Sequence, residues 1–579
     1  MGTFRVWAPA ARETVELDVG GHRVPMTRAG GGWWTADVPE GGQELEYAFR
    51  VDGGKALPDP RSPWQPRGVH GPSRIPDPAF AWTDGAWQPP PLACAVVYEL
   101  HVGTFTPEGT FEALIGRLDY LKGLGVTHVE LMPVNEFPGS FGWGYDGVDL
   151  FAPHHAYGGP SGLNRLVDAC HARGLAVLLD VVYNHFGPEG NYLPRFGPYL
   201  NADCRTAWGE AVNLDGAGSD EVRRFFCDNA RQWLRDYHFD GLRLDAVHAY
   251  FDRSAVHLLE ELGATVRGLE NELGRHLVLI AESDLNDPRV LRAPGAGGYG
   301  VDAQWSDDFH HALHALLTGD RTGYYADFGR LEHLAKALSN AFVYDGIRSQ
   351  YRGRRHGRKP AGLAGSRFLG YLQTHDQVGN RATGDRIGHL TSPDRQKVGA
   401  ALVLTSPFVP MLFQGEEWAA SSPFLYFADH EDPALRAAVA EGRRSEFASF
   451  GWDPESIPDP GARETFERSK LRWEELGLEP HASMLEWYRS LVRLRHREPA
   501  LRDGRLEEVD VRYSEEERWI AVGRGPFTVL ANLSERARSL PLAPDRPRNI
   551  LLRSRSDAHV GETSAELPPE SVLLLGPAS

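Results

Sequence analysis

Eight segments between residues 94 and 415 each have the pattern of a buried β-strand, and most are separated by sequences with helical periodicity. The segments are VVYELHV, VTHVELM, AVLLDVV, GLRLDAV, LVLIAES, VDAQWS, FLGYLQTH and VPMLFQG. After the first of them, FEALIGRLDYLKGLG carries apolar residues at 111, 114, 115, 118 and 121, which lie on one helical face. Eight strands alternating with helices predict an α/β fold, a closed parallel (β/α)8 TIM barrel.

The sequences on either side of this region predict two smaller β domains. Residues 1–90 contain FRVWAP, TVELDV, GWWTADV and LEYAFRV between Gly-rich turns, which is typical of a small β-sandwich. Residues 496–579 carry RWIAVGRG, FTVLANL and SVLLLG and predict a C-terminal β-sandwich. The catalytic barrel is therefore assigned to residues 91–495, and its polar, Gly-rich segment at about 186–219 is predicted to be a rim insertion.

Composition excludes several classes of function. The formal net charge is −18 and no basic stripe is present, so nucleic acid is not an expected partner. The N-terminus, MGTFRVWAPA, does not resemble a secretory signal, and no apolar run is long enough to span a membrane. The 4 cysteines lack metal-ligand spacing and are interpreted as reduced core residues. We expect a cytoplasmic monomer with no membrane partner.

Three acids follow predicted strands, where a β/α barrel places its active site. Asp245 lies in GLRLDAVH, Glu282 in LVLIAESD and Asp376 in YLQTHDQVGN. Paired carboxylates at that rim favour chemistry on a glycosidic bond. Arg243 shares a strand face with Asp245 and would keep it ionised, while the apolar residues before Glu282 would raise the pKa of that carboxyl.

Each of these residues also has a plainer interpretation. A single strand-end aspartate is more often a solvated loop residue or a helix N-cap, but three acids at strand ends favour a common site. His185 in VVYNH and His375 in QTHDQ could hydrogen-bond sugar hydroxyls, although either histidine alone would more often be structural.

The segments DVVYNH, GLRLDAVH, AESD and THDQ resemble, in order, the four strand-end signatures of the alpha-amylase superfamily of retaining glycosidases, glycoside hydrolase family 13. This resemblance implies that Asp245 is the nucleophile, Glu282 the general acid/base and Asp376 the transition-state stabiliser. It also implies that Arg243, His185 and His375 line the same subsite and that Tyr145 stacks on the sugar. Asp180 and Asn184 resemble structural positions that hold calcium in some relatives, but no complete oxygen cage is evident, so no metal and no cofactor are predicted.

Longer stretches are similar to the malto-oligosyltrehalose trehalohydrolase family within this superfamily. They include WGYDGVDLFAPHHAYGGP, LDVVYNHFGPEGNYL, QWSDDFHHALHALLTG and FQGEEWAASSPFLYFADHED, and the similarity covers essentially the whole chain. Val247 stands where amylases usually have lysine, which argues against an ordinary starch-cleaving site. The resemblance implies hydrolysis of the alpha-1,4 bond next to the terminal trehalose of maltooligosyltrehalose, with trehalose as a product. Further implied substrate contacts are Leu244, Ala246, Val247, His248, Ser306, Asp307, Asp308, Phe309, His310, Gln377, Val378, Gly379 and Asn380.

Several interpretations stay open at this point. Trp305 could stack on a sugar or lie in the core, and Trp33 and Trp34 could form a glycan platform or fill the first domain. Glu416 and Glu417 could bind a trehalose hydroxyl or form an ion pair behind the site. The alternative enzyme is a glycogen-debranching or glycogen-branching member of the superfamily. A non-catalytic glycan-binding protein is the alternative from another class, and it would be expected to have lost one of the three acids.

Overall fold

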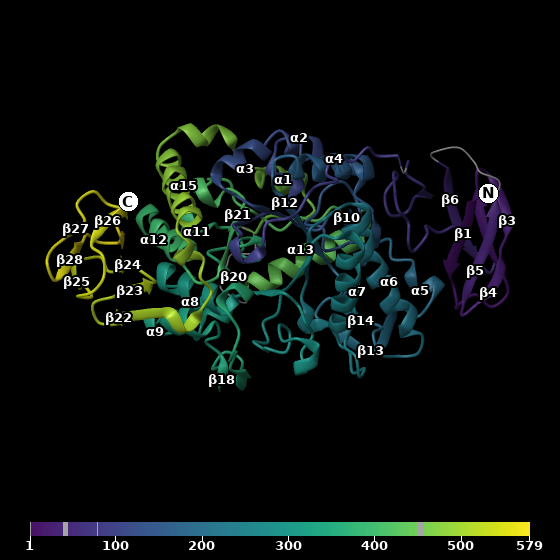
Figure 1. Cartoon of the computed structure of the whole chain (residues 1–579). Coiled ribbons are helices and arrows are strands. Elements are labelled where there is room, and N and C mark those ends of the chain that lie inside the picture. The colour runs from purple at the N-terminus through teal and green to yellow at the C-terminus, as the bar shows by residue number, and fades with distance from the viewer. Residues whose placement is uncertain (1, 39–44, 78, 449–456, 579) are drawn as a thin grey trace.

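The computed structural model describes residues 2–38, 45–77, 79–448 and 457–578. Its described parts form a β domain at the N-terminus, a central barrel and a second β domain, and the two β domains lie at opposite ends of the molecule (Figure 1). The predicted fold class is thereby confirmed. The boundaries at 90/91 and 495/496 stay predictions.

The central barrel has the predicted topology. In the part of the chain that the structure describes, eight parallel strands close the barrel in sequence order. They are β8 (Val97–Leu100), β9 (His128–Leu131), β12 (Ala176–Val181), β15 (Gly241–Leu244), β16 (Val278–Ala281), β17 (Ala303–Trp305), β20 (Phe368–Tyr371) and β21 (Val409–Phe413). All residues of these strands are buried, because side chains fill the interior and helices cover the outside.

Helices surround the barrel (Figure 1). They include α2 (Phe111–Ile115), α3 (Leu118–Leu124), α4 (Gly159–His171), α6 (Ser219–Arg231), α7 (Leu258–Leu273), α8 (Asp307–Thr318), α12 (Pro393–Leu404) and α15 (His481–Arg497). The single helix predicted over residues 111–125 is wrong, because Gly116 and Arg117 separate α2 from α3. Glycine is a poor helix former, and the Arg117 N–H bonds to Leu114 in a tighter turn.

The predicted rim insertion forms between β12 and α6. It contains the short helix α5 (Leu193–Phe196) and an antiparallel hairpin of β13 (Leu200–Thr206) and β14 (Gly209–Val212). Further elements around the barrel are α1 (Val102–Phe105), β10 (Asn135–Glu136), β11 (Asp149–Pro153), α9 (Leu331–Asn340), β18 (Asp345–Arg348), β19 (Arg355–Gly357), α10 (His375–Gly379), α11 (Ile387–Leu390), α13 (Pro433–Ala448) and α14 (Arg463–Arg468).

The N-terminal domain contains two antiparallel sheets. One has the order β1 (Gly2–Trp7), β5 (Trp33–Val38), β4 (Thr27–Gly30), and the other has the order β3 (His22–Pro25), β2 (Val15–Val19), β6 (Glu46–Val51), β7 (Ser73–Arg74). Burial alternates along β2 and β5, as expected where one face of a strand meets a core. Trp34 is only 5% exposed, which favours the core interpretation, whereas the half-buried Trp33 lies beneath the guanidinium of Arg5.

The C-terminal domain contains a five-stranded and a three-stranded sheet. The larger has the order β22 (Val509–Ser514), β23 (Trp519–Arg524), β24 (Phe527–Asn532), β29 (Ser571–Gly576), β26 (Asn549–Arg553), and the smaller has β25 (Arg538–Pro541), β28 (Ser564–Leu567), β27 (His559–Val560). Ala521 faces the small core between these sheets, while its neighbours Ile520 and Val522 join the main core. Because side chains alternate along a strand, one face of the large sheet packs in the small core and the other face packs against the rest of the molecule.

Two further expectations from the sequence concern membrane-spanning helices and the burial of the cysteines. Within the described ranges, no helix is both long enough and apolar enough to cross a membrane. Cys170 and Cys227 are buried free thiols, as expected. Cys94 and Cys204 are partly exposed, so assigning all cysteines to the core was wrong for these two.

Candidate active site

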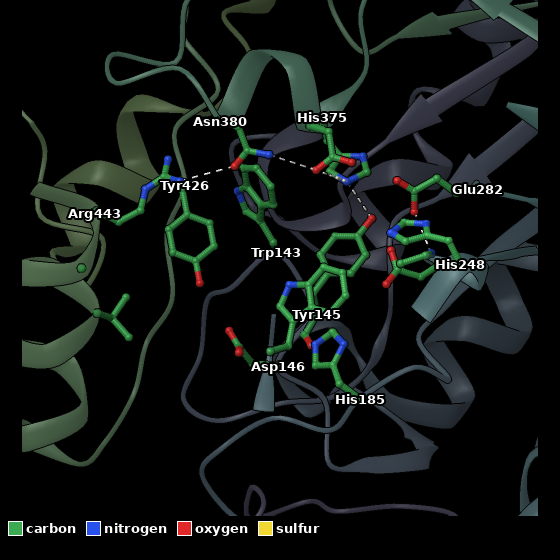
Figure 2. Close-up of a pocket in the computed structure, with 16 residues that line it drawn as sticks. Trp143, Tyr145, Asp146, His185, His248, Glu282, His375, Asn380, Tyr426 and Arg443 are labelled. Atoms are coloured by element: carbon green, nitrogen blue, oxygen red, sulfur yellow. Dashed lines mark hydrogen bonds and ion pairs between the residues drawn. The ribbon is translucent and has the colours of Figure 1, made fainter. Parts of the chain in front are cut away.

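Asp245, Glu282 and Asp376 line one pocket at the carboxyl ends of the barrel strands. Figure 2 shows this pocket with Glu282 beside His248. Asp245 directly follows β15, Glu282 directly follows β16, and Asp376 lies in α10, which begins shortly after β20. The cavity has a volume of about 480 Å³, which is within the usual range for a small-ligand site. The strand-end pattern therefore brings together the acids that it predicted.

The guanidinium of Arg243 contacts the carboxylates of Asp180, Asp245 and Glu282. Its Nη1 donates to Asp180 Oδ2 at 2.8 Å and to Asp245 Oδ1 at 2.7 Å, and its Nη2 lies 2.9 Å from Glu282 Oε2. The Arg243 side chain is fully buried, and its guanidinium carbon lies 4.2 Å from the centre of the Trp305 ring. Burial opposes the charged form, but the carboxylates of Asp180, Glu282 and Asp245 hold the pKa of Arg243 well above its usual value.

The surroundings of Asp245 and Glu282 are polar. Asp245 Oδ2 accepts a 2.9 Å hydrogen bond from Asn184, so both oxygens of this carboxylate are held. Glu282 Oε2 accepts a 2.7 Å hydrogen bond from the backbone N–H of Ala246. The predicted apolar setting of Glu282 is therefore wrong, because the apolar residues before it lie within the strand and its carboxylate meets donors.

Ala246 adopts a strained conformation to make this contact. Its φ of 40° lies in the left-handed region, where a residue with a side chain carries a cost of roughly 1–3 kcal/mol. This turn directs the Ala246 N–H at Glu282 immediately after Asp245 leaves the strand. Such local strain is characteristic of functional sites.

Tyr145 and His375 form one wall of the pocket. Their rings stack with centroids 5.1 Å apart and an interplanar angle of 20°. Tyr145 donates a 2.6 Å hydrogen bond to Asp180, which also accepts from Arg243. Burial raises the pKa of Asp180 to about 7 against the opposing charge of Arg243. Tyr145 is thus fixed by the same network that holds Asp245.

His185 lies next to Tyr145 in the same pocket (Figure 2). Its Nε2 donates to the backbone carbonyl of Tyr145 at 3.0 Å, and burial lowers its pKa. Trp208, in the turn of the rim hairpin, stacks on the His185 ring at 5.3 Å and remains 49% exposed. The insertion therefore contributes an aromatic surface to the pocket.

Several residues that line the pocket were not predicted from the sequence: Trp143, Asp146, Trp208, Tyr426, Val439, Gly442 and Arg443. The last three belong to α13, which forms the wall facing Glu282 and His248 across the cavity (Figure 2). Trp143 and Asp146 flank Tyr145 in sequence, and Trp208 lies in the predicted rim insertion, so these could have been suspected. No signal near the strand ends points to α13.

Among the predicted substrate contacts, Ala246, His248 and Asn380 line the pocket together with Tyr145, His185 and His375. Others are directed elsewhere: Leu244, Val247, Phe309 and Val378 are buried apolar side chains, and Ser306, Asp307, Asp308, His310, Gln377 and Gly379 do not line the cavity.

The segment of residues 306–310 has structural contacts instead. Asp308 accepts backbone hydrogen bonds from Val343 and Tyr344 at 2.6 and 2.9 Å, and His310 Nε2 lies 2.9 Å from the Tyr325 hydroxyl. Gln377 is part of a capping box with Thr374. Because α8 begins at Asp307, most of these side chains are buried where α8 packs against its neighbours, and they do not reach the pocket.

Two open interpretations are resolved by burial. Trp305 is 1% exposed beneath Arg243, so it is a core residue. Glu416 and Glu417 are fully buried and accept hydrogen bonds from the hydroxyls of Tyr488 and Tyr98. A trehalose contact by either glutamate is therefore incompatible with its position.

Potential metal ligands also gather outside the pocket. Among the described residues, such groups are Glu136, His154 and His155, and His70, Glu189 and Glu431. In the first, His155 Nδ1 already lies 2.6 Å from Glu136 Oε1, and in the second, Glu189 accepts backbone hydrogen bonds from Glu431 and Asp432. Neither group includes one of the three pocket acids.

Comparison with known proteins gives a consistent result. Residues 76–197 match the model of the alpha amylase catalytic domain, and residues 504–574 match a domain of unknown function, DUF3459. The chain is 50% identical to the malto-oligosyltrehalose trehalohydrolase of Rhizobium sp. (strain M-11), over 99% of this chain and 97% of the relative. It is 53% identical to that of Arthrobacter ramosus, over 92% of each chain. A crystal structure of a protein described as an alpha amylase from Salmonella typhimurium superposes with a TM-score of 0.91 at 40% identity, covering 99% of this chain and 97% of that one. Together with the pocket of three acids, this full-length similarity establishes that the chain belongs to the malto-oligosyltrehalose trehalohydrolase family, within the alpha-amylase superfamily of glycoside hydrolases.

Proposed function

We propose that the protein hydrolyses the alpha-1,4-glucosidic bond next to the terminal trehalose unit of maltooligosyltrehalose, releasing trehalose and a maltooligosaccharide. The observation that carries this specificity is the 50% identity, over 99% of the chain, to an enzyme of that name. The pocket supports the chemistry, because Asp245 and Glu282 contact the two terminal nitrogens of one guanidinium. This proximity is consistent with a retaining glycosidase, whose carboxylates are only about 5 Å apart.

The proposed reaction is a double displacement. Glu282 donates a proton to the oxygen of the departing trehalose while an Asp245 oxygen attacks the anomeric carbon, which breaks the glycosidic bond and forms a β-linked ester. Glu282 then takes a proton from water, the water attacks the same carbon, and the ester bond to Asp245 breaks. Asp376 would hold hydroxyls of the distorted sugar.

Hydrogen bonds and an ion pair hold the two carboxylates in position for these roles. Arg243 and Asn184 hold the two Asp245 oxygens, which fixes the carboxylate for attack. The Ala246 N–H and Arg243 fix the Glu282 carboxylate at the adjacent strand end. The stacked rings of Tyr145 and His375 would support the sugar at the scissile bond, and Trp208 and α13 would bound the rest of the substrate.

Product analysis tests the proposal. The purified protein is incubated separately with maltooligosyltrehalose and with branched glucan, and the products are separated chromatographically. Trehalose from the first substrate and no debranching or branch transfer with the second are the expected results. Debranching or new branches without trehalose would instead favour the alternative enzyme. Sugar binding without turnover would favour a glycan-binding protein, which the presence of all three acids disfavours.

The roles of the acids are tested by Asp245→Asn and Glu282→Gln. Each should lower kcat by several orders of magnitude, about 10⁴-fold or more for the nucleophile. Azide, which needs no general base, should restore turnover to Glu282→Gln from an activated substrate but not to Asp245→Asn. Glu112→Gln is the matched control, because its side chain is 68% exposed on α2 and it should retain the wild-type rate. Near-normal rates for both site variants would exclude the assignment. We also propose that the protein is a monomer and that it is located in the cytoplasm.

A further inference from the structure

Glu99 contacts His375 from behind the pocket. It belongs to β8, the first barrel strand, whereas His375 begins α10 after the seventh. Glu99 Oε1 lies 2.5 Å from His375 Nδ1, and Glu99 Oε2 accepts a 3.1 Å hydrogen bond from the His375 backbone N–H. Both side chains are 1% exposed. Glu99 therefore holds the ring and the backbone of His375 without reaching the pocket.

The other nitrogen of His375 faces the substrate side. His375 Nε2 lies 2.8 Å from the Tyr145 hydroxyl and 3.4 Å from Asp376 Oδ1. The Tyr145 hydroxyl donates its hydrogen to Asp180, so its oxygen is free to accept one from His375. Both ring nitrogens thus have acceptors, an arrangement that suits an imidazolium. Burial alone would lower the pKa of His375, but the charges of Asp376 and Glu99 and the Glu99 hydrogen bond raise it to about 9.

We propose that Glu99 is a positioning residue for the hydrolysis: its paired contacts keep His375 doubly protonated and fix the ring against Tyr145 and Asp376. The contacts continue from Tyr145 through Asp180 and Arg243 to Asp245. This series of contacts begins at Glu99 and ends at the proposed nucleophile. This inference rests on the proposed function, because it assigns Glu99 a part in that reaction.

Other ionisable groups packed around His375 do not replace Glu99. Glu130 on β9 is 1% exposed, and neither of its carboxylate oxygens has a hydrogen-bond partner among the residues that the structure describes. Burial, together with the charges of Glu99 and Asp180, raises the pKa of Glu130 well above its usual range, which favours its neutral form. Burial lowers the pKa of His101 to about 3, so that ring is neutral as well. Asp180 contacts Arg243, and Asp376 lies 3.4 Å from His375 Nε2 on the partly exposed pocket side. Glu99 is therefore the buried carboxylate in contact with His375 Nδ1.

The test compares Glu99→Gln, Glu99→Asp and the matched control Glu130→Gln on the full-length protein. Glu99→Gln removes the charge at nearly constant volume, and kcat for trehalose release should fall by roughly 10- to 100-fold with a smaller change in KM. The alkaline limb of the kcat/KM profile should move at least one pH unit lower, because His375 loses its counter-charge. Glu99→Asp should restore the position of that limb, and Glu130→Gln should match wild type within about threefold.

A direct measurement of the protonation state of the His375 ring distinguishes failure of this proposal from failure of the proposed function. The ¹³Cε1 signal of His375, assigned by its loss in His375→Asn, is followed with pH in histidine-labelled wild type. We expect a protonated ring at pH 7.5 and a neutral one in Glu99→Gln. A neutral wild-type ring overturns the proposal, even if Glu99→Gln fails to fold. Wild-type rates and pH profile in a folded Glu99→Gln also overturn it, whereas a wild-type enzyme that releases no trehalose refutes the function.

Discussion

Replacing Arg243 by lysine tests whether one guanidinium organises the site. The arginine contacts Asp180 and Asp245 through Nη1 and Glu282 through Nη2. A lysine ammonium ends in a single nitrogen and cannot reach both sides at once. We therefore expect the variant to keep a positive charge near Asp180 and Asp245 but to release Glu282, or the reverse.

The magnitude follows from the hydrogen bonds and ion pairs that lysine cannot form. A polar contact to a charged group contributes about 1.5–3 kcal/mol, and the substitution removes one or two of these, which gives about 1.5–6 kcal/mol, with about 3–4 kcal/mol in the middle of that range. Because each 1.36 kcal/mol corresponds to a factor of ten, kcat/KM should fall by roughly 10²- to 10³-fold if most of the loss falls on the transition state. The rest of the lost interaction energy should lower the free energy of unfolding, since a buried carboxylate is left without its positively charged partner.

The assay measures kcat/KM for trehalose release and the urea denaturation midpoint of the same samples. Arg165→Lys is the matched control: that side chain is 51% exposed and pairs with Glu112 at 3.1 Å, a type of surface contact worth at most about 1 kcal/mol. It should leave both quantities almost unchanged. An Arg243→Lys enzyme within threefold of wild type and equally stable would refute the argument that the forked geometry matters.

Three further predictions concern the pocket wall, a close contact and a buried acid. Trp208→Ala removes the ring stacked on His185 and should raise KM by roughly 2- to 10-fold with little change in kcat; an unchanged KM would argue against a substrate contact. At Gly379 an added Cβ would lie 2.0 Å from the Trp143 ring, so Gly379→Ala should lower the free energy of unfolding in urea by about 1–3 kcal/mol, whereas equal stability would mean that Trp143 relaxes freely. Burial raises the pKa of Glu416 to about 8 from 4.5, so the folded state retains a proton that the unfolded state loses, and stability declines as pH rises between these values. Glu416→Gln should reduce that decline between pH 5 and pH 8 in urea denaturation, and an identical pH dependence would contradict the burial argument.

The barrel and the placement of its acids were predictable because both depend on local patterns. Each strand is a short, mostly apolar segment of the right length, and parallel strands in a barrel deliver their carboxyl ends to one face. Asp245 and Glu282 directly follow such segments. Their roles came from family resemblance, because the strand pattern itself does not distinguish a nucleophile from an acid.

The rest depended on contacts between distant parts of the chain. Helix α13 and Trp208 reach the pocket because long connections fold back over the rim, and no periodic pattern encodes that return. The polar setting of Glu282 arises from Arg243 and from the left-handed turn at Ala246, two residues after the adjacent strand ends. Similarly, Glu416 follows a barrel strand but is enclosed by α15, so its place after the strand wrongly suggested that it reaches the rim.

The most direct test of the central claim is a proton NMR time course of wild-type enzyme with maltooligosyltrehalose. Because a double displacement retains the anomeric configuration, we expect trehalose and the α-anomer of the new maltooligosaccharide reducing end to appear together at equal initial rates. The β-anomer should form only later, by mutarotation. Initial formation of the β-anomer would contradict the double displacement through Asp245, and a maltooligosaccharide formed without trehalose would contradict the proposed bond specificity.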